Sequence, residues 1–595
     1  MNSFVVLLII LKPITIKRSF NIIPFIQTLR DYSFSSLKGD AIAGITVGVI
    51  LIPQAVAYAM LMGAPPIYGL YASLVPLMVY AIFGSSKYLS IGPVAITAIL
   101  LMNGVSELAT PFSDLFVTFL IVAGLLVGLF QIFLGILRLG FLVNLISQPV
   151  LSGFISAAAL IIVFSQLGGL LGIRIPKQDH QFESIIYIFN HLGDFNWITT
   201  AITIGSMLLF SLIKLWKKSF PSALLLILVT TLGSYYFDLQ AMQVAIIGEV
   251  PTGLPFVNIP ELSIAQIQQL LPTILSVTFI GYVGSIGVAK ALEVKKRDHT
   301  VRPNQELFAL GLAKVIGSLF LAIPTSGSYS RTAINEESGA KTTVSSLVSA
   351  FLVVIALLVL TPLFYYIPSV ILSVIIVLSV VKLIDVREAI RLFKIRRSDF
   401  LVFLITFIVT FFMGMEKGIL AGVILSFIFI IYHSSRPHLA ELVNIPSTPY
   451  YKNRDRFPEA SSTEKLLILR FDDQLYFANA SYFKEAMIRF VEQRKTKPEF
   501  LILDCTNMHD LDSTGLQVLI DLWRYLHQYQ IQFLLSGTIG PVRDFLKRSG
   551  FTEMIGVDHF FLTINDAVEF TEHNTIDPTR MEFANQTNTK RSLLD

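Results

Sequence analysis

The sequence predicts an α-helical membrane protein that is followed by a small α/β domain. Hydrophobic residues make up 54% of the 595 residues and charged residues 14%, whereas soluble domains carry about 25% charged residues. Apolar runs long enough to cross a bilayer recur up to residue 436. After Pro437, short apolar strands alternate with amphipathic helices, which is typical of a soluble α/β domain.

The first apolar stretch, FVVLLIIL over residues 4–11, is similar to the core of a signal peptide. No basic residue precedes it and no small-residue cleavage site follows it. We therefore expect residues 1–37 to form an uncleaved extension on the cytoplasmic side of the membrane.

Twelve further runs have about the length that a helix needs to cross roughly 30 Å of hydrocarbon. In chain order they are Ala41–Met62, Ile67–Phe83, Leu115–Ile136, Leu145–Leu167, Trp197–Leu215, Pro221–Tyr236, Ile267–Ala289, Leu307–Ile323, Val344–Tyr366, Val370–Leu383, Phe400–Met413 and Gly418–Tyr432. Two more, Pro93–Val105 and Ser328–Glu337, are too short to cross. They stand third and tenth among about 14 segments, the same place in two halves of seven. This arrangement indicates an inverted repeat with a binding site between broken helices.

Basic residues in the loops predict the topology, because cytoplasmic loops carry an excess of lysine and arginine. If the N-terminus is cytoplasmic, that side collects two clusters, Lys295–Arg302 and Lys394–Arg397, while the other side holds little beyond Arg174, Lys177 and Lys417. We expect residues 38–436 to span the cytoplasmic membrane many times, embedded in the lipid bilayer. The net charge of +4 is small and scattered, and it excludes a nucleic-acid partner.

The remaining chain has three parts. Residues 437–463 contain Pro437, Pro446 and Pro449 and are expected to form a polar linker. In residues 464–570, the runs KLLILRF (465–471), FLILDC (500–505) and IQFLLSG (531–537) predict buried strands, with helices over 481–494 and 514–529. Residues 571–595 have no periodicity and predict a disordered tail. The single cysteine, Cys505, excludes an internal disulfide and a cysteine-built metal site, and we expect no cofactor.

The tenth segment carries the most informative charge. Within IPTSGSYSRTAINEESGAKT (323–342), Arg331 follows several hydroxyl residues between long apolar runs. A charged side chain at the centre of a bilayer costs about 2.5–3.5 kcal/mol on insertion scales, so it indicates a function. In the matching stretch of the first half, SSKYLSIGPVAITA (85–98), Gly92 and Pro93 predict a helix that starts inside the membrane. Two half-helices whose N-termini face each other form an anion pocket.

The first segment supplies further polar groups through IPQAVAYA (52–59). Pro53 interrupts the helix, Gln54 offers an amide and Tyr58 an aromatic wall. Such residues also occur in ordinary helix packing. Beside two short helices they become candidates for the lining of a site.

These stretches resemble the SulP family of sulfate permeases, relatives of the animal sulfate, chloride and bicarbonate exchangers. The motifs are LIPQAVAYAML (51–61), PPIYGLYAS (65–73), SSKYLSIGPVA (85–95), NQELFALG (304–311) and SGSYSRTAIN (326–335). The resemblance implies seven plus seven segments in core and gate bundles, a homodimer and an elevator-like movement. It places the anion between the third and tenth helices, lined by Gln54, Tyr58, Pro93, Val94, Ser328, Tyr329 and Ser330, with Arg331 behind.

The sequence departs from the family at Gly284, where proton-coupled members usually carry a glutamate. Simple proton symport through this position is therefore in doubt, and exchange, coupling to a cation such as sodium, and uncoupled passage all stay open. Glu293 and Glu306 lie near the cytoplasmic ends, and we expect both to be solvated. We expect Lys314, in the ninth segment, to extend toward an interface.

The soluble domain resembles a STAS domain, the fold shared with bacterial anti-sigma-factor antagonists, and its marker is LDSTG (511–515). Ser513 or Thr514 is expected to cap the helix that begins there. A phosphate on either hydroxyl is the regulatory alternative, because a helix N-terminus favours added negative charge.

Together these features predict a secondary transporter of a small inorganic anion, with sulfate first and bicarbonate or a dicarboxylate next. An enzyme is disfavoured because the chain has no nucleophile elbow, HExxH or P-loop. A nucleobase permease would need carboxylates in the eighth and tenth segments. An anion channel or a sensor remains open as an alternative.

Overall fold

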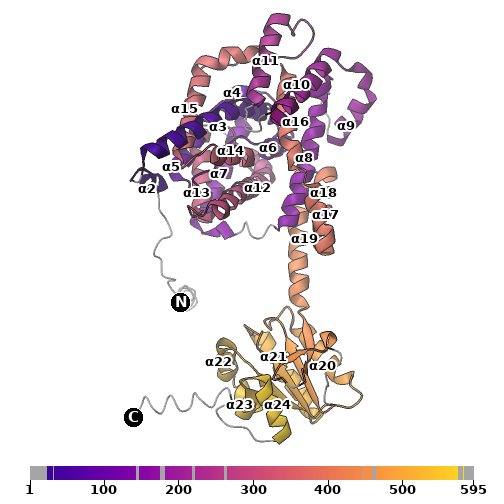
Figure 1. The fold of residues 1–595 in the computed structure, drawn as a ribbon. Coiled ribbons are helices and arrows are strands. Elements are labelled where there is room, and N and C mark those ends of the chain that lie inside the picture. The colour runs from indigo at the N-terminus through magenta and orange to yellow at the C-terminus, as the bar shows by residue number, and fades with distance from the viewer. Residues whose placement is uncertain are drawn as a thin grey trace. The chain divides into compact units, whose positions relative to one another are not determined.

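The computed structural model describes residues 23–30, 32–141, 147–173, 181–216, 222–259, 264–446, 448–457, 464–573 and 581. The chain forms two compact units, divided between Ser426 and Phe427 (Figure 1). The first unit is helical and the second contains a sheet with helices.

Every expected membrane segment coincides with helix in the structure. The helices are α3 (Phe34–Leu61), α4 (Pro66–Ala72) with α5 (Val75–Phe83), α6 (Ala95–Ser106), α7 (Asp114–Ile136), α8 (Gln148–Leu171), α10 (Trp197–Trp216), α11 (Ser222–Phe237), α12 (Ile264–Lys296), α13 (Pro303–Leu319), α14 (Tyr329–Glu337), α15 (Val344–Ile355), α16 (Ser369–Val380), α18 (Arg397–Met413) and α19 (Met415–Ser435). Among the described residues, 8 helical stretches are long and apolar enough to cross a membrane.

Several features of the helices were not predicted. The second segment breaks between α4 and α5, where Pro76 occupies the first turn of α5 and cannot continue the preceding helix. The eleventh segment continues beyond α15 as a π-helical and then a 3₁₀ stretch, up to Tyr366. The short helices α2 (Pro24–Arg30), α9 (Gln181–Asn190) and α17 (Val386–Ile395) were missed. They are too short or too polar for a search based on long apolar runs.

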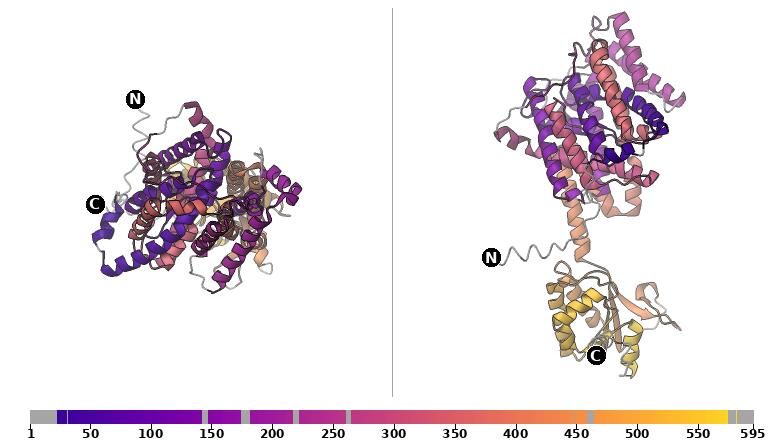
Figure 2. Two further views of the ribbon diagram at one scale, coloured as in Figure 1. Left: turned by 90° about the horizontal axis from the view of Figure 1, so that it is seen from above. Right: turned by 90° about the vertical axis from the view of Figure 1, so that its left-hand side faces the viewer.

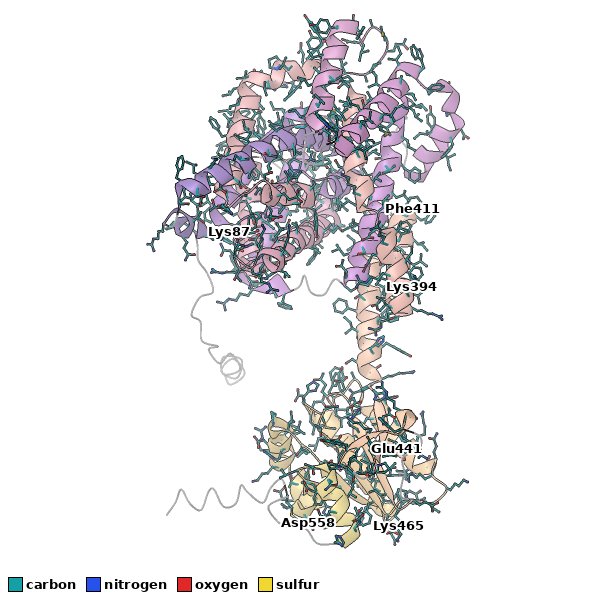
Figure 3. The ribbon with its side chains drawn as sticks, in the orientation of Figure 1. Lys87, Lys394, Phe411, Glu441, Lys465 and Asp558 are labelled. Atoms are coloured by element: carbon teal, nitrogen blue, oxygen red, sulfur yellow. The ribbon has the colours of Figure 1, made fainter. Side chains whose placement is uncertain are left out.

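The helices of the first unit pack in two groups (Figures 1 and 2). In one group, α7 packs along α13, and α12 packs on both α6 and α7. In the other, α8 packs along α16 and α18; Phe411 of α18 (Figure 3) lies edge-on to Phe164 of α8 with ring centroids 6.2 Å apart. The contact between α7 and α13 is close because two glycines meet, and a Cβ added at Gly311 would lie 2.6 Å from the backbone oxygen of Gly128.

Two short strands join the halves of the first unit. Strand β1 (Ile91–Gly92) pairs antiparallel with β2 (Ser326–Gly327), with Ile91 opposite Gly327 and Gly92 opposite Ser326. Helix α6 begins three residues after Gly92, and α14 begins two residues after Gly327. The N-terminal ends of both short helices therefore meet at this ladder.

The second unit is a six-stranded sheet in the order β4-β3-β5-β6-β7-β8. The strands are β3 (Leu439–Asn444), β4 (Tyr451–Asn453), β5 (Leu466–Phe471), β6 (Phe500–Asp504), β7 (Gln532–Ser536) and β8 (Phe560–Phe561). Strands β5 to β8 are parallel, and β3 and β4 are antiparallel to their neighbours. The three predicted strands are confirmed, and Cys505 is buried beside β6.

Helices cover both faces of this sheet (Figure 2). They are α20 (Ala480–Glu492), α21 (Ser513–Gln528), α22 (Gly540–Arg548), α23 (Phe551–Ile555) and α24 (Ile564–His573). Apolar residues of α20, α21, α22 and α23 form a core with one face of the sheet. On the other face, Ala567 and Val568 of α24 pack against the strands.

The structure differs from the expected organisation of the second unit at the linker. The expected linker, 437–463, contains β3 and β4, and Leu439 pairs with Phe471 of β5. Strand β3 is fixed further by Glu441 (Figure 3), which accepts hydrogen bonds from Arg454 at 3.0 Å and from Arg494. Frequent prolines obscured the short alternating pattern of LAELV. The expected tail, 571–595, lies outside the described residues except for 571–573, which end α24, and Met581, which pairs with Phe561.

We predict that Gly311→Ala destabilises the first unit by about 1–3 kcal/mol, because the new methyl group would press on the backbone of α7 and not on a movable side chain. Gly205→Ala in α10 is the matched control, since nothing lies within 4 Å of its added Cβ and alanine favours a helix by up to about 1 kcal/mol over glycine. Thermal unfolding of the purified protein in detergent measures the stability of both variants. Equal midpoints for the two variants would contradict the close α7–α13 contact.

Candidate functional site

Arg331 lies in the first turn of α14 and is completely buried. Its Nη1 donates to Oε1 of Gln54 at 3.0 Å and to the carbonyl of Pro93 at 3.2 Å. Its Nε and Nη2 have no hydrogen-bond partner among the described residues. Because a buried N–H group without an acceptor is costly, these two groups mark a place where an acceptor is missing.

Gly92 permits this placement of the guanidinium. A Cβ added at Gly92 would lie 3.1 Å from Nη2 of Arg331 and 3.3 Å from the side chain of Leu51. The glycine that breaks the chain in the sequence therefore also makes room for the arginine. The charge sits directly beside β1, just ahead of α6.

The starts of α6 and α14 are bonded to one another across the ladder. Ser328 N donates to the carbonyl of Ser90 at 3.0 Å, and Ser90 N donates to Oγ1 of Thr332 at 3.0 Å. Oγ of Ser326 and Oγ1 of Thr97 lie 3.2 Å apart. The two half-helices thus form one bonded unit.

The N-termini of the two helices differ in how they are capped. Helix α6 follows Val94, which is half-buried, and has no side-chain cap. In α14, Oγ of Ser328 accepts from Arg331 N at 3.4 Å and lies 3.3 Å from Oγ of Ser330. Unpaired N–H groups at a helix start carry partial positive charge and favour an anion.

The predicted residues of the first segment lie on one face of α3. Gln54 and Tyr58 are both buried, one helical turn apart. The phenol of Tyr58 is within electrostatic reach of Arg331. By contrast, Tyr329 is 45% exposed and Ser330 is also exposed, so the described residues do not enclose the start of α14.

Helix α12 presents three glycines to this region. A Cβ added at Gly281 would lie 2.7 Å from Oγ of Ser326, and one at Gly287 would lie 2.7 Å from the hydroxyl of Tyr329. Gly284 stands between them, and nothing lies within 4 Å of its added Cβ. The position without the expected carboxylate thus faces open space beside the start of α14.

The prediction that Glu306 is solvated was wrong. Glu306 is completely buried in the first turn of α13. Its carboxylate accepts from the hydroxyl of Tyr80 at 2.7 Å, from the backbone N and Oγ of Ser85 at 2.7 Å, and from Ser86 N at 3.1 Å. It fixes the segment that leads into β1. Near the end of α12, Glu293 is partly buried and pairs with Lys290 at 2.6 Å.

Asp298 fixes the same lead-in segment from the loop between α12 and α13. It accepts from the hydroxyl of Tyr88 at 2.5 Å and lies 3.7 Å from Nζ of Lys87. Burial alone would raise the pKa of Asp298, but hydrogen bonds from Tyr88 and His299 and the charge of Lys87 outweigh it and lower the pKa to about 2. The carboxylate is therefore ionised at neutral pH.

The prediction that Lys314 extends toward an interface was also wrong. Its side chain is 2% exposed. Its Nζ donates to Oε1 of Gln131 on α7 at 3.0 Å and to the carbonyl of Leu310 at 3.4 Å. Helical side chains tilt toward the N-terminus of their helix, and the lysine here tilts inward against α7.

In the second unit, the cap of α21 differs from the expectation. Asp512 is the capping residue, and its Oδ1 accepts from Gly515 N at 2.7 Å while its Oδ2 accepts from Phe477 N at 2.9 Å. Ser513 and Thr514 follow it in the first turn and are exposed. A carboxylate is a better acceptor than a hydroxyl at a helix start, which explains the choice.

Sequence reasoning missed the small polar residues that hold the ladder. Oγ of Ser285 on α12 accepts from Gly327 N at 2.7 Å and donates to the carbonyl of Gly281. Thr97 and Thr332 make the contacts described above. A lone hydroxyl in an apolar helix is common, and only its position on the face that carries Gly281 and Gly284 could have singled out Ser285.

The model of the sulfate permease family matches residues 37–406, and that of the STAS domain matches residues 457–567. The chain belongs to the sulfate permease family. Sulfate transporter 4.1, chloroplastic, of Arabidopsis thaliana is 36% identical over 568 residues, which cover 92% of this chain and 82% of that protein. A probable sulfate transporter of Mycobacterium tuberculosis is 31% identical over 547 residues, covering 92% and 97%.

Solved structures agree with the fold. Murine Solute Carrier 26 family member A9, an anion transporter in the inward-facing state, superposes with a TM-score of 0.86 at 24% identity over 94% of this chain and 96% of that one. The transmembrane domain of the cyanobacterial bicarbonate transporter BicA gives a TM-score of 0.58 at 23% identity over 66% and 98%. This sulfate permease family member is thus a helical membrane transporter with a C-terminal STAS domain, and its family is not one of enzymes.

We predict that Asp512→Ala loosens α21, because it removes the acceptor of two backbone N–H groups; loss of a cap alone costs about 0.5–2 kcal/mol. Ser513→Ala is the control, since the neighbouring hydroxyl is exposed. Hydrogen exchange of the full-length protein, followed by mass spectrometry, measures protection of the amides in α21. Equal protection in both variants would show that Asp512 is not the operative cap.

Proposed function

We propose that this protein is a secondary transporter that moves a small oxyanion, with sulfate as the first substrate and bicarbonate or a dicarboxylate next. The observation that carries this proposal is the guanidinium of Arg331, which is completely buried between two helix N-termini and leaves Nε and Nη2 without a partner among the described residues. An anion is the ligand that satisfies both the charge and the free N–H groups.

The chemistry of the site suits an oxyanion. A guanidinium presents its N–H groups in a planar fork that matches two oxygens of one anion. Helix N-termini add donors and partial positive charge from the sides. The hydroxyls of Ser328 and Ser330 lie at the exposed start of α14 and provide further donors.

The contacts within the first unit support an elevator-type movement. The residues of the proposed site come from α3, α6 and α14, and hydrogen bonds join these elements to each other. Helices α7, α12 and α13 pack around them, whereas α8, α16 and α18 form the second group. The first group corresponds to the proposed core that carries the anion, and the second to the proposed gate.

The orientation and assembly belong to the same proposal. We place the protein as a homodimer in the cytoplasmic membrane, with the N-terminus and the STAS domain in the cytoplasm. The excess of basic residues in loops on one side supports this orientation. Gly284 supplies no carboxylate for a proton, so exchange, coupling to a cation such as sodium, and uncoupled passage are the modes that the proposal leaves open.

We expect purified protein in proteoliposomes to take up labelled sulfate, and Arg331→Met to lower the affinity for sulfate about 10–150-fold, which corresponds to loss of charged hydrogen bonds worth about 1.5–3 kcal/mol. Uptake is measured with sodium or proton gradients imposed in turn, and with bicarbonate and dicarboxylates as competitors. Arg331→Lys retains the positive charge but not the planar fork of N–H groups. We expect its affinity for sulfate to lie between that of the wild-type protein and that of Arg331→Met.

Size-exclusion chromatography and thermal unfolding control for folding of both arginine variants. If vesicles that contain the protein neither accumulate nor exchange any anion above the level of empty vesicles, the protein is better interpreted as a sensor than as a transporter. An anion flux that greatly exceeds the rates of carriers and shows no exchange would indicate a channel. Unchanged affinity in folded Arg331→Met would make the arginine a structural residue only.

We also expect Gly284→Glu to make sulfate uptake depend on an inward proton gradient. The position has open space for a side chain, and a carboxylate in apolar surroundings is much less costly when protonated than when ionised. Gly284→Gln is the matched control, because the amide has the same shape and cannot take up a proton at neutral pH. Uptake at an external pH of about 6 is compared with uptake at about 7.5. Identical responses of the two variants would refute the prediction.

A further inference from the structure

Lys314 is a second buried basic residue in the helices around the proposed anion site. Its two acceptors, the Gln131 amide and the Leu310 carbonyl, are both uncharged. Among the described residues, no carboxylate lies within ion-pair distance of its Nζ. Glu306, on the same helix, is eight residues away, about 12 Å along the axis. The side-chain nitrogen of Lys314 therefore has no counter-charge among the described residues, which is costly for its protonated form.

The orientation of Gln131 is fixed by bonds at both ends of its amide. Nε2 donates to the carbonyl of Thr278 on α12 at 3.2 Å, and Oε1 accepts from Lys314 at 3.0 Å. Turning the amide over would place an oxygen against a carbonyl and an NH₂ group against an ammonium. The completely buried glutamine thus holds Nζ of Lys314 in place without supplying a counter-charge.

This charge belongs to the group of helices that builds the proposed site. Thr278 lies one turn before Gly281, the residue of α12 that abuts Ser326 of β2. Ser318, one turn after Lys314 on α13, abuts Gly124 of α7, which also abuts Pro324 ahead of β2. The lysine is therefore held by α7, α12 and α13, the three helices that pack behind the ladder.

We propose that Lys314 keeps its proton in the interior and is a specificity-determining residue: a second fixed positive charge that acts with Arg331 to favour divalent over monovalent anions at the proposed site. The inference rests on the proposed function. Coulomb energy is proportional to the product of the charges, so a fixed cation stabilises a divalent anion twice as much as a monovalent one. Buried charges are screened little by salt, so the effect reaches the site without direct contact.

The other buried charges of the first unit do not cancel this effect. Asp40 accepts from the backbone N–H groups of Lys341 and Thr342, and Glu306 is bonded to the segment before β1. Glu336 is paired with both Lys295 and Lys296. These groups remain the same in every variant considered below, so comparisons between anions isolate the charge of Lys314.

The test compares sulfate with nitrate in Lys314→Met. Dissociation constants are measured on the full-length protein, by direct binding of labelled sulfate and by competition with nitrate. If the variant weakens nitrate binding by a given factor, it weakens sulfate binding by the square of that factor. For separations of roughly 10–15 Å and an effective dielectric constant of about 20, the preference for sulfate falls about tenfold.

Two further variants separate charge from shape. Lys314→Arg keeps the charge and retains the preference for sulfate over nitrate. Gln131→Glu places a carboxylate beside Nζ and lowers the preference as Lys314→Met does, at similar side-chain volume. Thermal unfolding controls for folding, and replacing a lone buried charge by methionine is not expected to destabilise the protein.

The outcomes distinguish this inference from the proposed function. The inference is supported if Lys314→Met weakens sulfate binding by the square of the factor by which it weakens nitrate binding, and if Lys314→Arg retains the preference for sulfate over nitrate. Equal losses for both anions, or an unchanged ratio in Lys314→Met, overturn it while leaving anion transport intact. Wild-type protein that binds neither anion overturns the proposed function and this inference together.

Discussion

The hydrogen bonds from Arg331 to Gln54 and to the carbonyl of Pro93 are the interactions on which the candidate site depends. They join three elements that are far apart in the chain, the middle of α3, the start of α6 and the start of α14. They also use only one of the guanidinium nitrogens, so the positive charge stays available. A lysine in this place could not donate to two acceptors from one side and still present a fork on the other.

The ladder between β1 and β2 explains why the membrane helices around it are short. A chain that crosses lipid must satisfy its backbone N–H and C=O groups internally, and two residues of antiparallel strand do this for both halves at once. Buried hydroxyls complete the pairing where the strands end, as Ser285 does for Gly327 N and Thr332 for Ser90 N. Extended backbone can therefore exist inside the unit because α12 and α14 supply acceptors and α3 packs against β1.

The sequence allowed the positions of the membrane helices, the two short segments and the candidate arginine to be predicted, because length, hydropathy and the cost of burying a charge are local properties. It did not reveal the partners of Glu306 and Lys314. Both residues resemble ordinary polar groups near a helix end in the sequence, and only the packing of α13 against α5 and α7 removes them from solvent. Strand β3 was missed for a related reason, since its pairing with β5 depends on residues that are about 30 positions away.

Gly284 and Lys314 are informative together. Where a carboxylate at position 284 would offset part of the positive field around the ladder, this chain has open space, and behind the ladder it buries a lysine. With Lys314 protonated as proposed, the interior around the proposed site would be more positive than one arginine and two helix ends make it. Under the proposed elevator movement, an empty site that carries both charges would cross an apolar interior at a high electrostatic cost, and a bound divalent anion would lower that cost. This balance would favour exchange among the coupling modes that stay open.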